Sequence, residues 1–589
     1  MPGQAENRKL HSGRKEEKMD HKRLAELCFP HIDKTPEYYE ELYPERQLPE
    51  GAKVCRMGPS PTGFMHLGNL YSAFVDERLS HQSGGVFYLR IEDTDDKRYV
   101  EGAVPLILRS LDFFGIGFDE GAGIDPETGE DIDRGAYGPY HQSERAEIYQ
   151  SFAKRLVAEG KAYPCFLSEE EIEGIRAEQS AKEENIGIYG KYSPWRDASL
   201  EEVEKALSEG RPHVLRLRSS GDSEMANSRA EDKKLRYIDV YDAIRGKLHM
   251  PEHYQDAVIL KTNGIPTYHF AHAVDDHLMR TTHVVRGAEW LGTLPLHAEL
   301  FEKLGNELPI YCHTAQLMKI DEVTGQKRKL SKRSDPELSL DFYRELGYHP
   351  AAVREYLLTI LNSNFEEWRA ENPEADIDEF PFSTEKMSSD GALFDMDKLN
   401  NVSKDVLLRT EAGELSVFLK KWASEFDPEL ASLIEKYEQK EPGYLASILN
   451  IGRSGDKPRK DLIYAGQIRD FISYFFDERF KIEDELPAEV SKEDAAEILK
   501  RYLEGYEHSD EQPAWFEKIR KIAGELGYAE KPKDYKKNPE SFKGHVGHVS
   551  AAIRLAITGR SVSPDVWEIQ RILGEERTRV RVKNYVEKL

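Results

Sequence analysis

Residues 59–69 read P-S-P-T-G-F-M-H-L-G-N, a loop between a predicted strand at residues 54–57 and a predicted helix over residues 70–81. The two prolines stiffen and turn this loop, and Gly68 lets the backbone approach a ligand at the helix start. A helix N-terminus presents unpaired N–H groups and the positive end of a dipole, which favours phosphate. His66 lies beside that terminus, so the loop predicts a phosphate site.

A second short loop is basic. Residues 329–333 read K-L-S-K-R and are flanked by Gly325 and Asp335. Each loop alone is modest support, because a lone His before Leu-Gly usually belongs to a core or a surface, and a K-x-S-K loop is usually solvated. Together, around a nucleotide-binding core, they predict one triphosphate site built from both loops.

Strands and helices alternate from residue 53 onwards. A strand at residues 85–93 and a helix at residues 101–114 follow the first pair. Alternation of this kind predicts a parallel, doubly wound sheet. Ligands bind such sheets beyond the carboxyl ends of the strands, which places Arg56, Ser60 and Glu92 on one rim.

The two loops together resemble the two signatures of class I aminoacyl-tRNA synthetases, and P-S-P-T-G resembles the form in bacterial-type glutamyl-tRNA synthetases. The resemblance continues, in the family's order, through L-R-I-E-D-T-D (89–95), G-I-P-T-Y-H-F (264–270), V-D-D-H-L-M (274–279) and H-V-V-R-G-A-E-W (283–290). It covers residues 51–589. It implies an α/β fold: a Rossmann-type catalytic domain with an inserted α+β acceptor-binding domain, followed by all-α anticodon-binding domains.

The resemblance also implies domain boundaries. Residues 1–50 form an extension outside the family core, with 1–18 expected to be disordered and Met1 or Met19 as the start. The remaining expected domains are the first catalytic half at 51–132, the acceptor-end insertion at 133–262, the second catalytic half at 263–337, a helical stem-contact domain at 338–404 and a helical anticodon-binding region at 405–589.

The implied activity is glutamate–tRNA ligation. L-glutamate and ATP would form glutamyl-adenylate, and the glutamyl group would pass to the 3′ end of tRNA-Glu. His66 and Lys332 are the predicted catalytic residues. Asn69 stands where the family's first signature usually ends in His. The predicted ATP-binding residues are Thr62, Gly63, His66, Gly68, Asn69, Lys329, Leu330, Ser331, Lys332 and Arg333.

Glutamate recognition must satisfy two carboxylates and one ammonium. By resemblance, Arg56 and Arg286 are the cations, with Arg56 expected at the side-chain carboxylate, since Arg offers a planar fork for bidentate binding. Glu92 is expected to meet the ammonium. Ser60 would donate to the substrate, Tyr268 would close the pocket, and His272, where relatives often carry Asn, is predicted to line it.

Metal sites receive little support. Mg²⁺ is expected to arrive on the phosphates of ATP with few protein ligands. Asp95, Asp275 and Asp276 could suggest a two-metal site, but an organising role in the pocket or a position facing the tRNA end is favoured. Some relatives carry zinc near the position of Cys165; this segment reads Y-P-C-F-L-S without a second thiolate, so no zinc is expected.

Composition bounds the class of protein. The 589 residues are 39% hydrophobic and 10% aromatic, which is typical of a globular chain of several domains. Four scattered cysteines without a CxxC motif favour a reducing, cytoplasmic setting. No membrane-spanning run is visible, and a monomer is expected from the relatives.

The net charge of −26 is unusual for an RNA-binding protein, but the local potential on the docking face matters more than the total. Three basic clusters could contact RNA or could be solvated helix faces. They are residues 327–333, 453–460 and 577–583.

Alternative functions remain at this stage. A non-discriminating enzyme would also charge tRNA-Gln, and the sequence does not decide this. Glutaminyl enzymes carry a P-E-P-N-G-type first signature, which P-S-P-T-G does not match. A nucleotidyltransferase acting on a small molecule is less favoured because large predicted RNA-binding regions follow the core. A silent RNA-binding scaffold is disfavoured by the retained His66, Lys332, Arg56 and Arg286.

Overall fold

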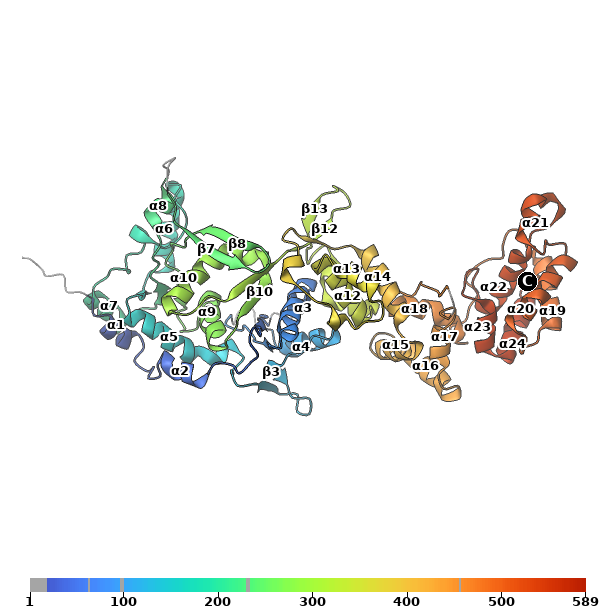
Figure 1. Cartoon of the computed structure of the whole chain (residues 1–589), viewed down its shortest axis with the longest axis horizontal. Coiled ribbons are helices and arrows are strands. Elements are labelled where there is room, and N and C mark those ends of the chain that lie inside the picture. The colour runs from blue at the N-terminus through green and yellow to red at the C-terminus, as the bar shows by residue number, and fades with distance from the viewer. Residues whose placement is uncertain (1–18, 62–63, 96–99, 229–233, 455–456) are drawn as a thin grey trace, which may run out of the picture. The chain divides into compact units, whose positions relative to one another are not determined.

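A computed structural model describes residues 19–589 apart from 62–63, 96–99, 229–233 and 455–456 (Figure 1). Thr62 and Gly63 of the predicted ATP site therefore lie outside the described residues. The chain forms two compact units. The first comprises Met1–Ser331, Leu361–Glu366 and Glu379–Leu393, and the second comprises Lys332–Ile360, Glu367–Asp378 and Phe394–Leu589. Among the described helices, none is long and apolar enough to cross a bilayer.

Two four-stranded sheets form the centre of the first unit. In the first sheet β1, β2 and β3 are parallel and β4 is antiparallel to β3. In the second sheet β10, β11 and β7 are parallel, and β7 forms an antiparallel ribbon with β8. The strands are β1 Val54–Met57, β2 Val86–Leu89, β3 Glu120–Ile124, β4 Asp131–Arg134, β7 Tyr237–Asp242, β8 Gly246–Pro251, β10 His283–Gly287 and β11 Ile310–Thr314.

The two sheets meet between β1 and β10. The backbone N–H of Thr282 donates to the carbonyl of Val54 over 3.0 Å, and the Val54 N–H donates to the Thr282 hydroxyl over 2.8 Å. The strand order across this junction is β3-β2-β1-β10-β11-β7. The chain therefore moves outwards in one direction from β1 to β3 and in the other from β10 to β11, with the earlier strand β7 beyond β11, which makes this junction a topological switch point. The predicted doubly wound sheet is confirmed.

Two three-stranded sheets complete the first unit. The antiparallel sheet β5-β6-β9 belongs to the predicted insertion, and β13-β12-β14 carries the start of the K-L-S-K-R segment. The predicted insertion at 133–262 also supplies β7 and β8 to the second central sheet, which its sequence pattern did not indicate. The strands are β5 Ala162–Cys165, β6 Val214–Leu217, β9 Val258–Leu260, β12 Leu317–Ile320, β13 Lys327–Lys329 and β14 Ala392–Leu393.

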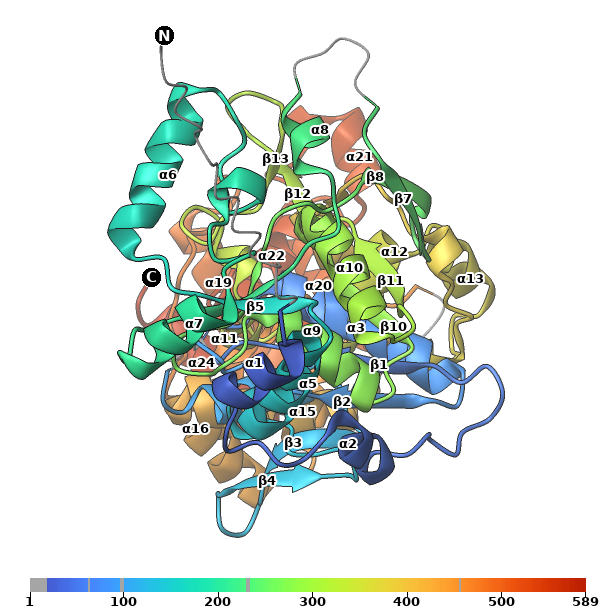
Figure 2. The same ribbon diagram turned by 90° about the vertical axis from the view of Figure 1, so that its left-hand side faces the viewer.

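The helices of the first unit lie on and around these sheets. The first two lie in the N-terminal extension and pack against α5; Figure 2 shows α1 beside it. The helices are α1 His21–Cys28, α2 Pro36–Leu42, α3 Leu67–Gln82, α4 Ala103–Phe113, α5 Ala146–Ala158, α6 Glu169–Ala181, α7 Leu200–Ser208, α8 Ser223–Asn227, α9 Tyr268–Leu278 and α10 Leu294–Leu304.

The second unit is helical, and its helices from residue 394 onwards confirm the predicted all-α region among the described residues. Helices α12 and α13 each extend past the division between the units. The helices are α11 Leu340–Leu346, α12 Pro350–Leu361, α13 Phe365–Glu371, α14 Met396–Arg409, α15 Ala412–Phe426, α16 Pro428–Lys440, α17 Tyr444–Leu449, α18 Ala465–Ile472, α19 Lys492–Gly505, α20 Gln512–Glu525, α21 Pro532–Lys537, α22 Val546–Thr558, α23 Val566–Leu573 and α24 Glu575–Val586.

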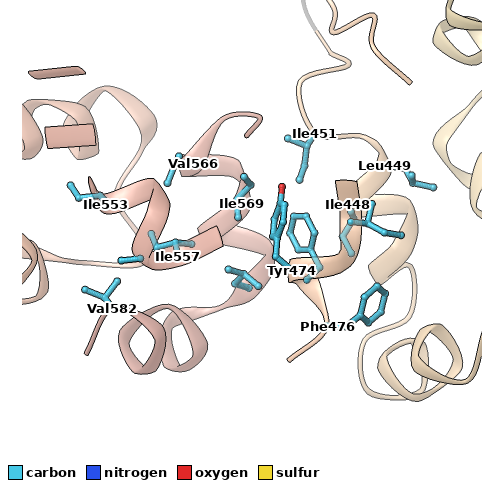
Figure 3. Packing of buried hydrophobic residues seen from close by; sticks show 14 of the residues in the cluster. Ile448, Leu449, Ile451, Tyr474, Phe476, Ile553, Ile557, Val566, Ile569 and Val582 are labelled. Carbon is cyan, nitrogen blue, oxygen red and sulfur yellow. The ribbon is translucent and has the colours of Figure 1, made fainter. Parts of the chain in front are cut away.

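One continuous core holds the C-terminal helices together. It extends from Leu407 to Val582 and contains the apolar faces of α15 to α20 and α22 to α24. Figure 3 shows side chains of α17 and the Tyr474 segment facing those of α22 and α23, among them Ile448, Ile557 and Ile569. Burial of such aliphatic and aromatic side chains stabilises the fold by about 1.5–3 kcal/mol each.

Candidate active site

The predicted glutamate residues surround the switch point. Arg56 lies near the carboxyl end of β1, Arg286 near that of β10, and Glu92 follows β2. Burial raises the pKa of Tyr268, the negative charge of Glu92 raises it further, and the positive charges of Arg286 and Arg56 lower it. Three charged groups from three strands therefore act on one hydroxyl, and the structure brings these predicted residues together.

Arg56 is held by a carboxylate. Its Nε donates to both oxygens of Asp276 over 3.2 and 3.1 Å, and Nη1 of Arg90 donates to Asp276 over 2.5 Å. Burial by itself would raise the pKa of Asp276, but these two guanidinium groups hold it well below its usual range. Among the described residues, no partner is recorded for the terminal nitrogens of Arg56, so its fork is available to a ligand while its Nε is fixed.

Arg90 is a pocket residue that sequence reasoning missed. It is fully buried, and its Nη2 donates to Oε1 of Glu92 over 3.1 Å. Burial raises the pKa of Glu92, while Arg90 and Arg56 act in the opposite direction. A Cβ at position 58 would lie 2.3 Å from Oε1 of Glu92, so a larger residue there would displace the Glu92 carboxylate. The signal was an arginine inside an otherwise apolar strand, V-F-Y-L-R-I.

Arg286 has a different environment. Its Nε donates to Nε2 of His313 over 2.9 Å, and its Nη1 lies 2.9 Å from Nδ1 of His297. The guanidinium carbon lies 4.5 Å from the ring centre of Tyr311, a cation–π contact. Its Nη2 is buried without a hydrogen-bond partner. Within the described parts of the chain, no carboxylate forms an ion pair with Arg286.

Tyr268 and His272 lie one turn apart on α9 and stack at 5.9 Å between ring centres. Tyr268 also packs against Trp290 at 4.7 Å. Nδ1 of His272 is 2.6 Å from Oδ2 of Asp276, and Nε2 is 2.9 Å from the Tyr311 hydroxyl. Burial lowers the pKa of His272 to about 4, so its ring is neutral near pH 7. Both of its nitrogens face protein groups, which favours a supporting role over direct glutamate contact.

His66 is the N-cap of α3. Its Nδ1 accepts from the backbone N–H of Asn69 over 3.2 Å, and Oδ1 of Asn69 accepts from the His66 N–H over 3.1 Å. This reciprocal cap starts the helix at Leu67, so the prediction of a start near Leu70 was wrong by one turn. Because Nδ1 accepts a hydrogen bond, a neutral His66 carries its proton on Nε2, the donor that a phosphate oxygen requires. Gly68 lies in the same turn, and a Cβ added at this position would lie 3.0 Å from Nδ1 of His66.

The K-L-S-K-R segment leaves the end of β13. Lys329 is exposed, and the backbone N–H of the buried Leu330 donates to Leu317 of β12 over 3.2 Å. The first stretch of the first unit ends at Ser331, and the exposed Lys332 and Arg333 belong to the second unit. The convergence of His66 and Lys332 on one triphosphate therefore stays a prediction.

The remaining candidate residues have structural partners or are exposed. Asp275 accepts hydrogen bonds from Arg145 (2.7 Å), Gln142 (2.8 Å) and Tyr149 (2.7 Å), all fully or almost fully buried, which is the organising role predicted for it. Ser60 is exposed at the rim. Among the described residues, no three His, Cys, Asp or Glu side chains are grouped as metal ligands.

The sequence of this chain matches a known catalytic domain. Residues 53–401 fit the family described as tRNA synthetases class I (E and Q), catalytic domain, and residues 429–586 fit an anticodon binding domain. The chain belongs to the class I tRNA synthetases of the E and Q group. The predicted family, fold class and enzyme class are confirmed.

Relatives of this class I synthetase match over nearly its full length. A glutamate–tRNA ligase of Acetivibrio thermocellus is 60% identical over 566 residues, 96% of this chain and 100% of the relative. One of Clostridium perfringens strain SM101 is 47% identical over 572 residues, with the same shares covered. A crystal structure of a glutamate tRNA ligase from Elizabethkingia meningosepticum, in complex with its amino acid, has a TM-score of 0.70 at 27% identity, covering 91% of this chain and 99% of that one.

Proposed function

We propose that this chain is a glutamate–tRNA ligase. It activates L-glutamate with ATP, releases diphosphate, and transfers the glutamyl group to the 3′ end of tRNA-Glu. Relatives with this name at 60% and 47% identity over 96% of the chain support the activity. The observation that carries the substrate assignment is the pair of arginines at the switch point, one held by a carboxylate and the other by neutral rings.

The charge of the pocket suits glutamate. Three of its four buried arginines pair with three carboxylates, and the fourth, Arg286, has no carboxylate in direct contact among the described residues. These groups are Arg56, Arg90, Arg145 and Arg286, with Glu92, Asp275 and Asp276. Glu92 receives the substrate ammonium, and Arg56 and Arg286 receive its carboxylates. Glutamine is rejected because its amide leaves a buried guanidinium without an anion.

Adenylate formation needs alignment more than proton transfer. The α-carboxylate of glutamate is ionised near pH 7 and attacks the α-phosphorus of ATP, while the bond to diphosphate breaks. His66 donates from Nε2 to the α-phosphate as negative charge develops there, and Lys332 stabilises the departing phosphates. In the second step a ribose hydroxyl of tRNA attacks the glutamyl carbonyl and AMP leaves.

Magnesium, in this proposal, arrives with ATP. Glu92, Asp275 and Asp276 each contact an arginine, so none of these three carboxylates offers a ready ligand set for a divalent cation. When bound, Mg²⁺ would neutralise phosphate charge. It would be held by phosphate oxygens and water.

The test is ATP–diphosphate exchange with glutamate, measured without tRNA, with tRNA-Glu and with tRNA-Gln. We expect exchange with tRNA-Glu together with formation of glutamyl-tRNA-Glu. Failure with every tRNA would contradict the ligase assignment. Equal charging of tRNA-Gln would instead support the non-discriminating alternative.

A second test addresses His66 in the loop before α3. His66→Ala removes one donor to the α-phosphate, so adenylate formation should slow by about 100-fold or more, since single preorganised donors contribute at this scale. tRNA affinity, measured by filter binding, should stay within about twofold. An unchanged adenylation rate would exclude the role given to His66.

A further inference from the structure

Arg286 is fixed by side chains that carry no negative charge. His313 accepts from its Nε and His297 lies against its Nη1, each at 2.9 Å. Burial lowers the pKa of both imidazoles, so both rings are neutral near pH 7. Arg56, the second cation of the pocket, is fixed instead by the carboxylate of Asp276 at 3.1 Å. Among the described residues, no anion in direct contact with Arg286 therefore competes with a ligand.

The tautomer of His313 follows from its partners. A guanidinium has only donors, so Nε2 of His313 must be the acceptor and its proton must be on Nδ1. Nδ1 lies 2.7 Å from Oδ2 of Asp242, a carboxylate that can only accept. The three groups therefore form a directed chain in which each N–H has one acceptor: Arg286 to His313, and His313 to Asp242.

Asp242 is a rigid end to this chain. Its Oδ1 accepts from the backbone N–H groups of Ile244 (2.9 Å) and Arg245 (2.8 Å). Its Oδ2 accepts from the backbone N–H of His313 (3.0 Å) in addition to the ring N–H. Burial would raise the pKa of Asp242, but these hydrogen bonds lower it, so it stays ionised. The side chains of Asp242 and His313 have no solvent exposure.

Sheet register brings the three residues together. Arg286 of β10 pairs with His313 of β11, and Tyr311 of β11 pairs with Asp242 at the end of β7. Residues in register on parallel strands point to the same face. The chain Asp242–His313–Arg286 thus crosses three neighbouring strands at the edge where the sheet binds ligands.

We propose that Asp242 and His313 are positioning residues for Arg286, which together set the affinity for glutamate and its preference over glutamine. This rests on the proposed function for the identity of the substrate. A neutral imidazole orients Arg286 without supplying a competing anion. The carboxylate of Asp242 does not contact Arg286. It contacts His313 and selects the His313 tautomer whose Nε2 can accept from Arg286.

The test compares two substitutions on β7. In Asp242→Asn the new amide can donate an N–H to Nδ1 of His313. The ring proton then moves to Nε2, where it faces the Nε–H of Arg286. The same change of tautomer occurs when the acid of a His–acid pair is replaced by its amide. We expect the glutamate KM to rise about 10- to 100-fold and the glutamate-to-glutamine preference to fall, with the ATP KM and kcat nearly unchanged. Asp239→Asn, an exposed carboxylate on the same strand, is the control and should leave all four values unchanged.

Selective ¹⁵N-histidine spectra provide a readout independent of activity. His313→Gln assigns the resonance, and the wild type should show the proton on Nδ1, whereas Asp242→Asn should show it on Nε2. A wild-type proton on Nε2 would overturn the proposal, as would equal rises in the KM for glutamate and for ATP. If the wild type shows the expected tautomer but charges no tRNA with glutamate, only the substrate assignment fails. If Asp242→Asn does not fold, His313→Gln must give the same selective rise in glutamate KM, or the proposal is wrong.

Discussion

The arginines of the candidate active site and those of the C-terminal helices look alike in sequence but have different surroundings. Arg286 lies against neutral rings and has one buried nitrogen without a partner. Arg577 and Arg581 both bind Asp477, at 3.1 and 2.6 Å, and both also donate to backbone carbonyls. The first type of arginine can still bind an anion, whereas the second is already used to join helices.

The comparison shows that a basic run in sequence does not report free charge. The cluster at 577–583 was a candidate RNA contact, yet its three arginines bind groups of their own unit, and Arg581 is buried. In the cluster at 453–460, Arg453 donates to three carbonyls at the C-terminal end of α14. These contacts satisfy helix-end groups that would otherwise lack partners. The alternative interpretation, a solvated helix face, describes neither Arg581 nor Arg453.

The largest expected effect is at Arg286. Arg286→Gln removes the unpaired cation, so a substrate carboxylate would be buried without a positive partner. We therefore expect kcat/KM for glutamate to fall about 100- to 1,000-fold. Arg577→Gln is the matched change in the other unit and should leave the glutamate KM within about twofold. Steady-state aminoacylation measures both. A similar loss in both variants would break the comparison.

An intermediate effect is expected on acidification. The pKa of His272 is lowered to about 4 by burial, against about 6.5 in an unfolded chain. Below pH 6.5 the unfolded chain takes up a proton that the folded pocket does not, so stability falls as pH decreases towards 4. The cost is about 2 kcal/mol at pH 5.

Hydrogen exchange can locate this loss. Peptides from α9 should lose more protection between pH 7 and pH 5 than peptides from α24, which contains no histidine. His272→Asn should reduce the loss in α9. Equal losses in α9 and α24 would show that the neutral histidines are not its cause.

The smallest effect is expected at Asp477. Burial would raise its pKa, but Arg581 and Arg577 lower it. Asp477→Asn removes this charge between two helix segments; because the Asp477 side chain is half exposed, solvent screening limits the cost to about 1 kcal/mol of unfolding free energy. Denaturant unfolding, followed by hydrogen exchange in α24, measures this loss of unfolding free energy. The affinity for tRNA should not change. A selective loss of tRNA affinity would return this cluster to the RNA-binding surface.

Much of the pocket could be predicted from local sequence. Arg56 and Arg286 lie near the carboxyl ends of their strands and Glu92 follows one, and parallel strands end at one edge of the sheet. Arg90, Asp242, His297 and His313 were missed, because their roles depend on contacts with other residues of the site; of the four, only Arg90 lies in a quoted motif, L-R-I-E-D-T-D. The start of α3 was also misplaced, since the reciprocal hydrogen bonds of His66 and Asn69 are not visible as periodicity. The predicted domain boundaries and ATP contacts remain predictions.

The amino-acid sequence alone determined the family, the alternating α/β pattern and the two loops expected at ATP, because these depend on residues close together in the chain. Only the tertiary structure decided which charges are compensated. Asp276 meets Arg56 across 220 positions, and His313 meets Arg286 because two strands pair in one register. Electrostatic interaction depends on distance in space and on burial, and neither follows from distance along the sequence.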